Sequence, residues 1–227
     1  MTEFLPFDKS TFASGVAEVF MALQTQDGAQ WHVAVVYKHD NQSLYIFHLA
    51  FHYLFRNEQV TGANQDYFVA PIGESEAANL EVMCAAFSNL EWPDAPYGLD
   101  SAGCIIDEHH ELVSAPIGKG FTCATAIIAI FRSLGFDLID ESKWPNRPED
   151  SVWQSSIINA VEVFGQRHSI PDIQDHIESM KSDIGAIRVR PTEVAAAGVR
   201  FDLPTEFTDC QSLAASIESD VNAQLGY

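Results

Sequence analysis

Residues 118–136, GKGFTCATAIIAIFRSLGF, pass from a glycine-containing turn into nine residues with almost no polar side chain. The pattern predicts a buried helix, with Thr122 as its N-cap and Gly135 just past its end. A buried helix needs other elements packed against it, and 227 residues with 47% hydrophobic content are enough for a substantial core. Because no segment has the composition of a linker, we expect a single domain over residues 1–227.

Two runs rich in aromatic and β-branched residues precede this helix and predict a hairpin. They are QWHVAVVYK (30–38) and SLYIFHLAF (43–51), separated by the polar residues HDNQ. A third strand is expected at DYFVAPI (66–72), and residues 104–115 are ambiguous, with a short strand pair around a polar DEHHE tip as one interpretation. The expected fold class is therefore α+β, with an antiparallel sheet packed against the helix that carries Cys123.

Most of the remaining chain has the pattern of helices. We expect a core over about 28–136, followed by a helical elaboration over about 140–227. Pro171 and Pro191 stand where helices commonly begin. The expected helices outside 118–136 span residues 10–24, 74–90, 148–166, 171–182, 191–197 and 208–223.

Cys123 has two interpretations. As a small apolar residue it shares one helix face with Ile127, Ile130, Phe131 and Leu134, which is typical of core packing. As a nucleophile it would use its place in the first helical turn, because a helix N-terminus and a neighbouring imidazolium lower the pKa of a thiol from about 8.5 to roughly 3.5–7.5. The second interpretation requires a matching histidine elsewhere in the chain.

His32 and His48 lie inside the two apolar strand runs, where a polar side chain needs a reason to be present. Directly paired positions of a hairpin have a constant index sum, so a three- or five-residue loop centred on Asp40 places His32 opposite His48 on one face. A two- or four-residue loop shifts the pairing by one residue and separates them. If they pair, one imidazole can serve as the base for Cys123 and the other can orient it, which is sufficient for acyl transfer. Each histidine alone can equally be a hydrogen-bonded core residue.

The strand W-H-V-A-V-V-Y, a second strand with F-H-L and a later helix F-T-C-A-T-A-I-I-A-I-F-R-S-L-G together resemble the circularly permuted papain-like proteins. That group is related to the NlpC-type cell-wall peptidases and includes the lecithin:retinol acyltransferase-like enzymes. The resemblance covers roughly residues 28–136 as a pattern of order and context, and it leaves the later helices and DEHHE unexplained. It implies a papain-like fold in which His32 is the base, His48 orients that base and Cys123 is the nucleophile.

The expected function is a cysteine hydrolase that cleaves an amide bond through an acyl-enzyme intermediate, with backbone N–H groups near Cys123 as oxyanion donors. The resemblance implies a peptide or peptidoglycan-type amide as substrate, and a triad of this kind needs no cofactor or metal ion. One alternative is an acyltransferase or thioesterase that acts on a lipid or small acyl substrate. Another is a catalytically inactive binding module of the same fold, against which the retention of all three candidate residues argues.

A zinc site is the competing chemistry. His48 and His52 are four residues apart in HLAFH, a spacing that suits zinc on a helix, but the glutamate of H-E-x-x-H is missing and the flanking residues favour a strand. His52 is also the reserve candidate for the third catalytic residue. The DEHHE segment is better explained as a solvated loop tip, although it offers several possible ligands, namely Asp107, Glu108, His109, His110 and Glu111.

Charge and cysteine spacing limit the partners and the compartment. Twelve basic against 32 acidic residues give a formal net charge of −20, which disfavours nucleic-acid and membrane-surface partners. No stretch is apolar enough to span a bilayer, and the N-terminus has acidic residues where a secretory signal is basic. We therefore expect a cytoplasmic protein, or one delivered by specialised secretion. The cysteines form no C-x-x-C pair, so we expect free thiols at Cys84, Cys104, Cys123 and Cys210.

Overall fold

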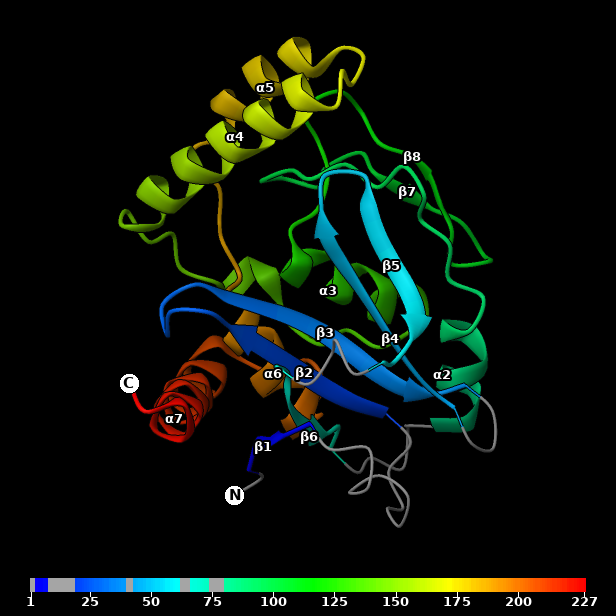
Figure 1. The fold of residues 1–227 in the computed structure, drawn as a ribbon, viewed down its shortest axis with the longest axis vertical. Helices are drawn as coiled ribbons and strands as arrows, with labels where there is room; N and C mark the ends of the chain where they lie inside the picture. Colours follow the sequence, from blue (N-terminus) through cyan, green and yellow to red (C-terminus); the bar gives the residue numbers. More distant parts are fainter. Residues whose placement is uncertain (1–2, 8–18, 40–42, 62–65, 74–79) are drawn as a thin grey trace.

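The computed structural model describes residues 3–7, 19–39, 43–61, 66–73 and 80–227. Its strands are β1 Leu5–Pro6, β2 Val19–Thr25, β3 Trp31–Lys38, β4 Leu44–Phe51, β5 Leu54–Gln59, β6 Phe68–Pro71, β7 Ile105–Ile106 and β8 Leu112–Ser114. The first six form one antiparallel sheet with the order β1-β6-β2-β3-β4-β5, and β7 pairs with β8 in a separate small sheet (Figure 1).

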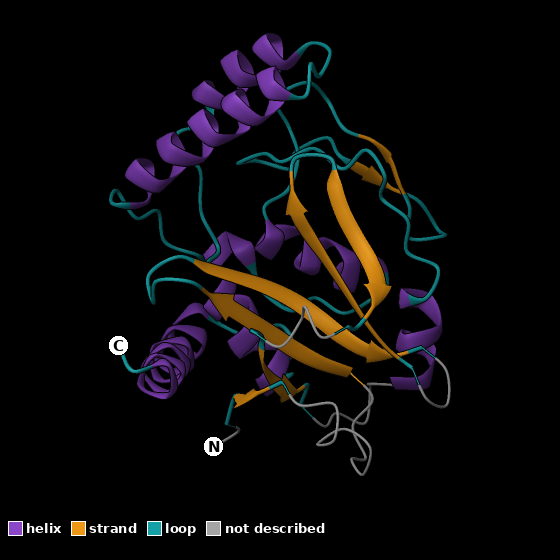
Figure 2. Cartoon of the chain, in the orientation of Figure 1, coloured by secondary structure: helices purple, strands orange, loops and turns teal. Residues whose placement is uncertain are grey.

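Helices surround this sheet and fill the C-terminal part of the chain (Figure 2). They are α2 Leu80–Phe87, α3 Cys123–Ser133, α4 Asp150–Arg167, α5 Ile173–Ser182, α6 Pro191–Arg200 and α7 Phe207–Leu225, with a 3₁₀ turn at Glu141–Lys143. Helices α3 and α6 pack on the sheet and contact each other, whereas α4 and α5 form a pair at one end of the molecule (Figure 1). The α+β class with an antiparallel sheet and C-terminal helices is therefore confirmed.

The central strand β2 is buried on both faces. Met21 belongs to the large core that includes α3 and α6, whereas Phe20 and Ala22 belong to a smaller cluster on the opposite face. Helix α6 comes close to β2 at Gly198, where a Cβ atom would lie 2.5 Å from the Met21 sulfur. The glycine therefore allows a close approach between helix and strand.

The expectation of a helix over residues 10–24 is wrong from Val19 onward, because residues 19–25 form β2. A strand buried on both faces has no polar–apolar alternation, so its apolar run is hard to distinguish from a helical one. Residues 10–18 lie outside the described residues, as do residues 74–79 of the helix expected at 74–90, of which α2 covers 80–87. Strand β5 was not predicted, since its sequence LFRNEQ is half polar.

Most other boundaries agree with the expectations to within a few residues. Strands β3, β4 and β6 lie within the three predicted runs, and β7 and β8 flank the DEHHE turn. Helix α6 begins at Pro191, whereas α5 begins at Ile173, two residues after Pro171. Gly135 follows α3 with a φ of 88°, the left-handed conformation in which glycine commonly ends a helix.

Candidate active site

Helix α3 begins at Cys123 behind a reciprocal cap. The Thr122 hydroxyl accepts a hydrogen bond from the Thr125 backbone N–H at 3.1 Å, and the Thr125 hydroxyl accepts one from the Thr122 N–H at 2.8 Å. These two bonds satisfy N–H groups that a helix start otherwise leaves unpaired. Cys123 is thereby held at the first helical position, where only 6% of its surface is exposed.

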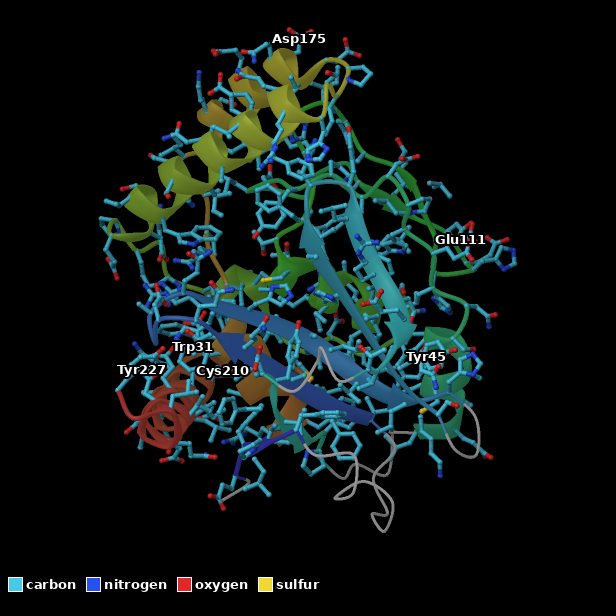
Figure 3. All side chains as sticks on the ribbon, viewed as in Figure 1. Trp31, Tyr45, Glu111, Asp175, Cys210 and Tyr227 are labelled. Atoms are coloured by element: carbon cyan, nitrogen blue, oxygen red, sulfur yellow. The ribbon has the colours of Figure 1, made fainter. Side chains whose placement is uncertain are left out.

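Cys123 and His32 line the same pocket, which has a volume of about 240 Å³. The pocket is formed by the β2–β3 hairpin, the end of β4, the N-terminus of α3, one face of α4 and the segment before α6. Trp31, which marks the start of β3 in Figure 3, also lines it. No hydrogen bond joins the side chains of Cys123 and His32 within the described part of the chain. The structure thus brings the predicted nucleophile and the predicted base to one cavity without a direct bond.

His32 and His48 are in direct contact. The His32 Nε2 and His48 Nδ1 atoms are 2.7 Å apart, and the two rings meet edge to face with centroids 4.8 Å apart. The register differs from the prediction, because Val35 pairs with Phe47 rather than with Tyr45. This shift of two residues keeps both histidines on one face and makes them diagonal instead of direct neighbours, and diagonal side chains of this length still meet.

The His32–His48 bond restricts the tautomers of both rings. If His32 donates its Nε2–H to His48, its Nδ1 keeps a free lone pair and can accept a proton. If His48 donates instead, His32 must carry its proton on Nδ1 and cannot act as a base when neutral. Only the first arrangement suits general-base chemistry.

Both imidazoles are held in the neutral form. Burial, together with the neighbouring His48, lowers the pKa of His32 to about 3. Burial and the Arg56 guanidinium, which stands opposite His48 on β5, lower the pKa of His48 to about 4. At neutral pH the pair therefore shares one hydrogen bond between uncharged rings.

The Cys123 thiol is also neutral at rest, which corrects the expectation of a lowered pKa. Burial raises the pKa of Cys123, and the backbone N–H groups of Val33 and Ala124 and the charge of Arg188 oppose this rise without cancelling it. The helix N-terminus is therefore outweighed by the loss of water around the sulfur. The resting site contains a thiol and a neutral imidazole, not a thiolate–imidazolium pair.

Two tyrosines that the sequence patterns did not indicate complete the surroundings of the thiol. Tyr67 lies just before β6, with its ring centroid 6.5 Å from that of His32 and 6.4 Å from that of His48. Burial and the nearby Cys123 raise the pKa of Tyr67. Burial likewise raises the pKa of Tyr97, and the Cys123 backbone N–H lies close enough to the Tyr97 phenol oxygen to counteract this. The Tyr97 hydroxyl and the Cys123 amide are thus neighbours at the start of α3.

The backbone of Tyr97 is held by two buried histidines. His52 accepts the Tyr97 N–H on its Nδ1 at 3.1 Å, and His176 Nε2 lies 2.9 Å from the Tyr97 carbonyl oxygen. The strand-like contact between Tyr97 and Phe121 fixes the same segment beside the start of α3. The close approach requires Gly120, since a Cβ there would lie 2.2 Å from the Pro96 carbonyl oxygen.

His52 therefore stands apart from the His32–His48 pair and holds Tyr97 instead, so the structure gives no support to it as the third catalytic residue. HLAFH lies in β4 and the turn after it, not on a helix. The DEHHE segment forms the exposed turn between β7 and β8, and Glu111 lies at the outer edge of the molecule (Figure 3). Among the described residues, no group of three His, Cys, Asp or Glu side chains is placed to hold a metal ion.

The four cysteines are free thiols, as predicted. Over the ranges that the structure describes, no helix is long and apolar enough to cross a membrane. No protein-family model matches the chain, and neither the curated proteins nor the solved structures include a significant match.

Proposed function

We propose that the protein is a cysteine hydrolase of the permuted papain-like type, with Cys123 as nucleophile, His32 as base and His48 as the residue that orients His32. The observation that carries the proposal is the 2.7 Å contact between His32 Nε2 and His48 Nδ1 at the pocket that Cys123 lines. A buried histidine pair next to a capped cysteine at a helix N-terminus has the composition of an acyl-transfer site. The proposed substrate is an amide, such as a peptide bond.

In the first half of the reaction, His32 Nδ1 takes the thiol proton while the Cys123 sulfur attacks the substrate carbonyl carbon. The carbonyl oxygen becomes an oxyanion, which the Cys123 backbone N–H and the Tyr97 hydroxyl can stabilise, because these two groups are neighbours. His32 then gives its proton to the leaving nitrogen, the C–N bond breaks and a thioester remains on Cys123.

In the second half, His32 removes a proton from water and the resulting hydroxide attacks the thioester carbonyl. The C–S bond breaks, the carboxylic acid leaves, and the proton returns from His32 to the sulfur. His48 Nδ1 accepts the His32 Nε2–H throughout, which keeps the catalytic nitrogen of His32 directed toward the pocket. The neutral resting state requires proton transfer during the attack, so the reaction is a general-base reaction and not an attack by a preformed thiolate.

Acyl trapping tests this proposal without knowledge of the natural substrate. The protein is treated with p-nitrophenyl acetate, quenched in acid and mapped by mass spectrometry. We expect acetylation of Cys123 in the wild type, none at that position in Cys123→Ala, and a rate at least about a hundredfold lower in His32→Ala, because the general base is lost. His109→Ala is the matched control, since His109 is exposed in the β7–β8 turn, and it is expected to react like the wild type.

Acetylation of Cys123 at an undiminished rate in a folded His32→Ala variant would contradict the mechanism. Stable acetylation that water never removes would favour a transferase or an inactive binding module over a hydrolase. Amide cleavage is then examined with a peptide mixture, in which products formed by the wild type and missing with Cys123→Ala identify the sequence that is cut.

A further inference from the structure

Arg188 lines the same pocket as Cys123, on the segment that leads into α6. Its guanidinium carbon lies 3.6 Å from the centroid of the Trp153 ring, so the cationic group is stacked on the indole. The side chain is 16% exposed, and its Nη1 donates a 3.0 Å hydrogen bond to Asp150 Oδ1. Stacking and this single bond fix the orientation of the guanidinium plane on the pocket wall.

The carboxylate that Arg188 contacts is shared among three arginines. Asp150 is 5% exposed and also forms ion pairs with Arg147 at 3.0 Å and with Arg190 at 3.0 Å. Arg147 has a second carboxylate, Glu193, and Arg190 has a second one in Glu149. The cluster therefore contains three guanidinium groups and three carboxylates, and Arg188 pairs with the one carboxylate that the other two arginines also contact.

Within the described residues, Asp150 is the only hydrogen-bond partner of the Arg188 guanidinium. A guanidinium has five N–H donors, so several remain to bind an acceptor from the pocket side. Asp27 is the acidic residue that lines the same pocket, and its Oδ1 already accepts the backbone N–H groups of Ala29 and Gln30. A stacked arginine with free donors at a pocket wall is well suited to a carboxylate, which can take two parallel N–H bonds.

Arg188 also lies near the proposed nucleophile. Its charge acts to lower the pKa of Cys123 and of Tyr97, which places the guanidinium within electrostatic range of both groups. A carboxylate bound to Arg188 would lie in the same pocket as the Cys123 thiol, so one bound molecule can present a carboxylate to Arg188 and a carbonyl to Cys123.

We propose that Arg188 is a specificity-determining residue that binds a carboxylate of the substrate, so that the site selects acyl compounds or peptides with a negative charge near the scissile bond. The substrate part of this proposal rests on the proposed hydrolase function, whereas carboxylate binding at Arg188 is independent of turnover.

Alkylation with two nearly isosteric reagents separates these statements. Iodoacetate carries a carboxylate and iodoacetamide a neutral amide, and in both cases the cysteine sulfur displaces iodide, the C–I bond breaks and the thiol proton passes to the medium. The ratio of the two rates at one cysteine cancels the ionised fraction of that thiol. Cys104 is the internal reference, because it is half-buried and lies outside the pocket, and the opposite charges of Asp100 and Lys119 near it form an ion pair.

We expect the iodoacetate-to-iodoacetamide ratio to be about tenfold higher at Cys123 than at Cys104, the effect of one hydrogen-bonded charge pair. Arg188→Gln should lower the Cys123 ratio about tenfold. It should also slow both reagents by the same factor, because the charge that lowers the pKa of Cys123 is lost, and the ratio cancels this effect. Arg188→Lys should retain part of the preference, since the charge remains while the fork of donors is lost. Arg190→Gln is the matched control, because Arg190 bonds to Asp150 at the same 3.0 Å but does not line the pocket, and its ratio should equal that of the wild type.

Equal ratios at Cys123 and Cys104 in the wild type would overturn the proposal, even if an Arg188 variant fails to fold. So would a Cys123 that reacts with iodoacetamide and not with iodoacetate, because the pocket then admits a small neutral reagent and excludes its carboxylate counterpart. A high ratio that Arg188→Gln leaves intact would assign the preference to another group. The hydrolase function is tested separately, by acetylation with the uncharged ester p-nitrophenyl acetate. If that experiment contradicts the hydrolase function and the iodoacetate-to-iodoacetamide ratio is still high and dependent on Arg188, the protein is a carboxylate-binding module.

Discussion

Replacing His52 with asparagine should make the protein less sensitive to acid. His52 is fully buried, and its Nδ1 accepts the Tyr97 N–H at 3.1 Å, which requires a neutral ring. Burial and the neighbouring His176 lower the pKa of His52 to about 4. Asparagine can accept the same N–H with its side-chain oxygen and does not titrate, so the variant keeps the bond and loses the pH dependence.

The magnitude follows from the two pKa values of His52. The unfolded chain has a pKa of about 6.5 and therefore binds the proton first as the pH falls. The contribution of His52 to the free energy of unfolding is therefore complete above about pH 6.5. It is lost progressively as the pH falls to about 4, where His52 of the folded state is also protonated. Between pH 7 and pH 5 the loss due to His52 is about 2 kcal/mol. The lowered pKa values of His32 and His48 also reduce the free energy of unfolding as the pH falls, so the total loss in the wild type is larger than that due to His52.

The measurement is the free energy of unfolding from urea titrations at pH 7 and pH 5. We expect the loss between these pH values to be about 2 kcal/mol smaller in His52→Asn than in the wild type. His109→Asn is the control, because His109 is exposed, and it should lose as much as the wild type. Equal losses in His52→Asn and the wild type, with unchanged m-values, would refute the claim that His52 is buried and neutral.

Two further outcomes concern the thiol. Tyr97→Phe removes the phenol O–H next to the Cys123 amide, so acetylation of Cys123 by p-nitrophenyl acetate should slow about a hundredfold. Alkylation by iodoacetamide forms no oxyanion and should keep its rate. Equal slowing of both reactions would indicate misfolding around Tyr97. Because burial raises the pKa of Cys123, its alkylation rate should still be rising above about pH 8.5, measured by peptide mapping across a pH series, and a plateau between about pH 6 and pH 7 would contradict this.

Features of the site that depend on local signals could be predicted from the sequence. The cap at Thr122 and the end of α3 at Gly135 each depend on residues close together in the sequence. The helix, with Cys123 in its first turn, could therefore be predicted directly. The strand runs around His32 and His48 were equally clear, but both rings share one face only because the hairpin loop has an odd number of residues, which the sequence left open. The register was displaced by two residues because hairpin turns of similar composition can have different centres.

The rest of the site depends on tertiary contacts that leave no local pattern. Tyr97 comes from a loop without periodicity, and Arg188 precedes a helix more than sixty residues after Cys123 in the chain. Neither residue type is unusual in its segment, and their roles appear only when the pocket is assembled. The neutral state of Cys123 was also missed, because the effect of a helix N-terminus can be inferred from sequence whereas the depth of burial cannot.

Because Cys123 and His32 are both neutral in the resting site, His48 has a larger role than the orientation of His32 alone. Burial disfavours the Cys123 thiolate and the His32 imidazolium separately, but one proton transfer creates both, so the pair has no net charge and each charge stabilises the other. The imidazolium must still donate its Nε2–H inside the protein, and His48 Nδ1 at 2.7 Å is the acceptor. We therefore expect acetylation of Cys123 to fall nearly as far in His48→Ala as in His32→Ala, because the buried imidazolium is left unpaired, and to fall about tenfold less in His48→Asn, which keeps an acceptor oxygen. Equal rates in folded His48→Ala and His48→Asn would show that the acceptor contributes nothing to the charged state, and the role assigned to His48 would have to be abandoned.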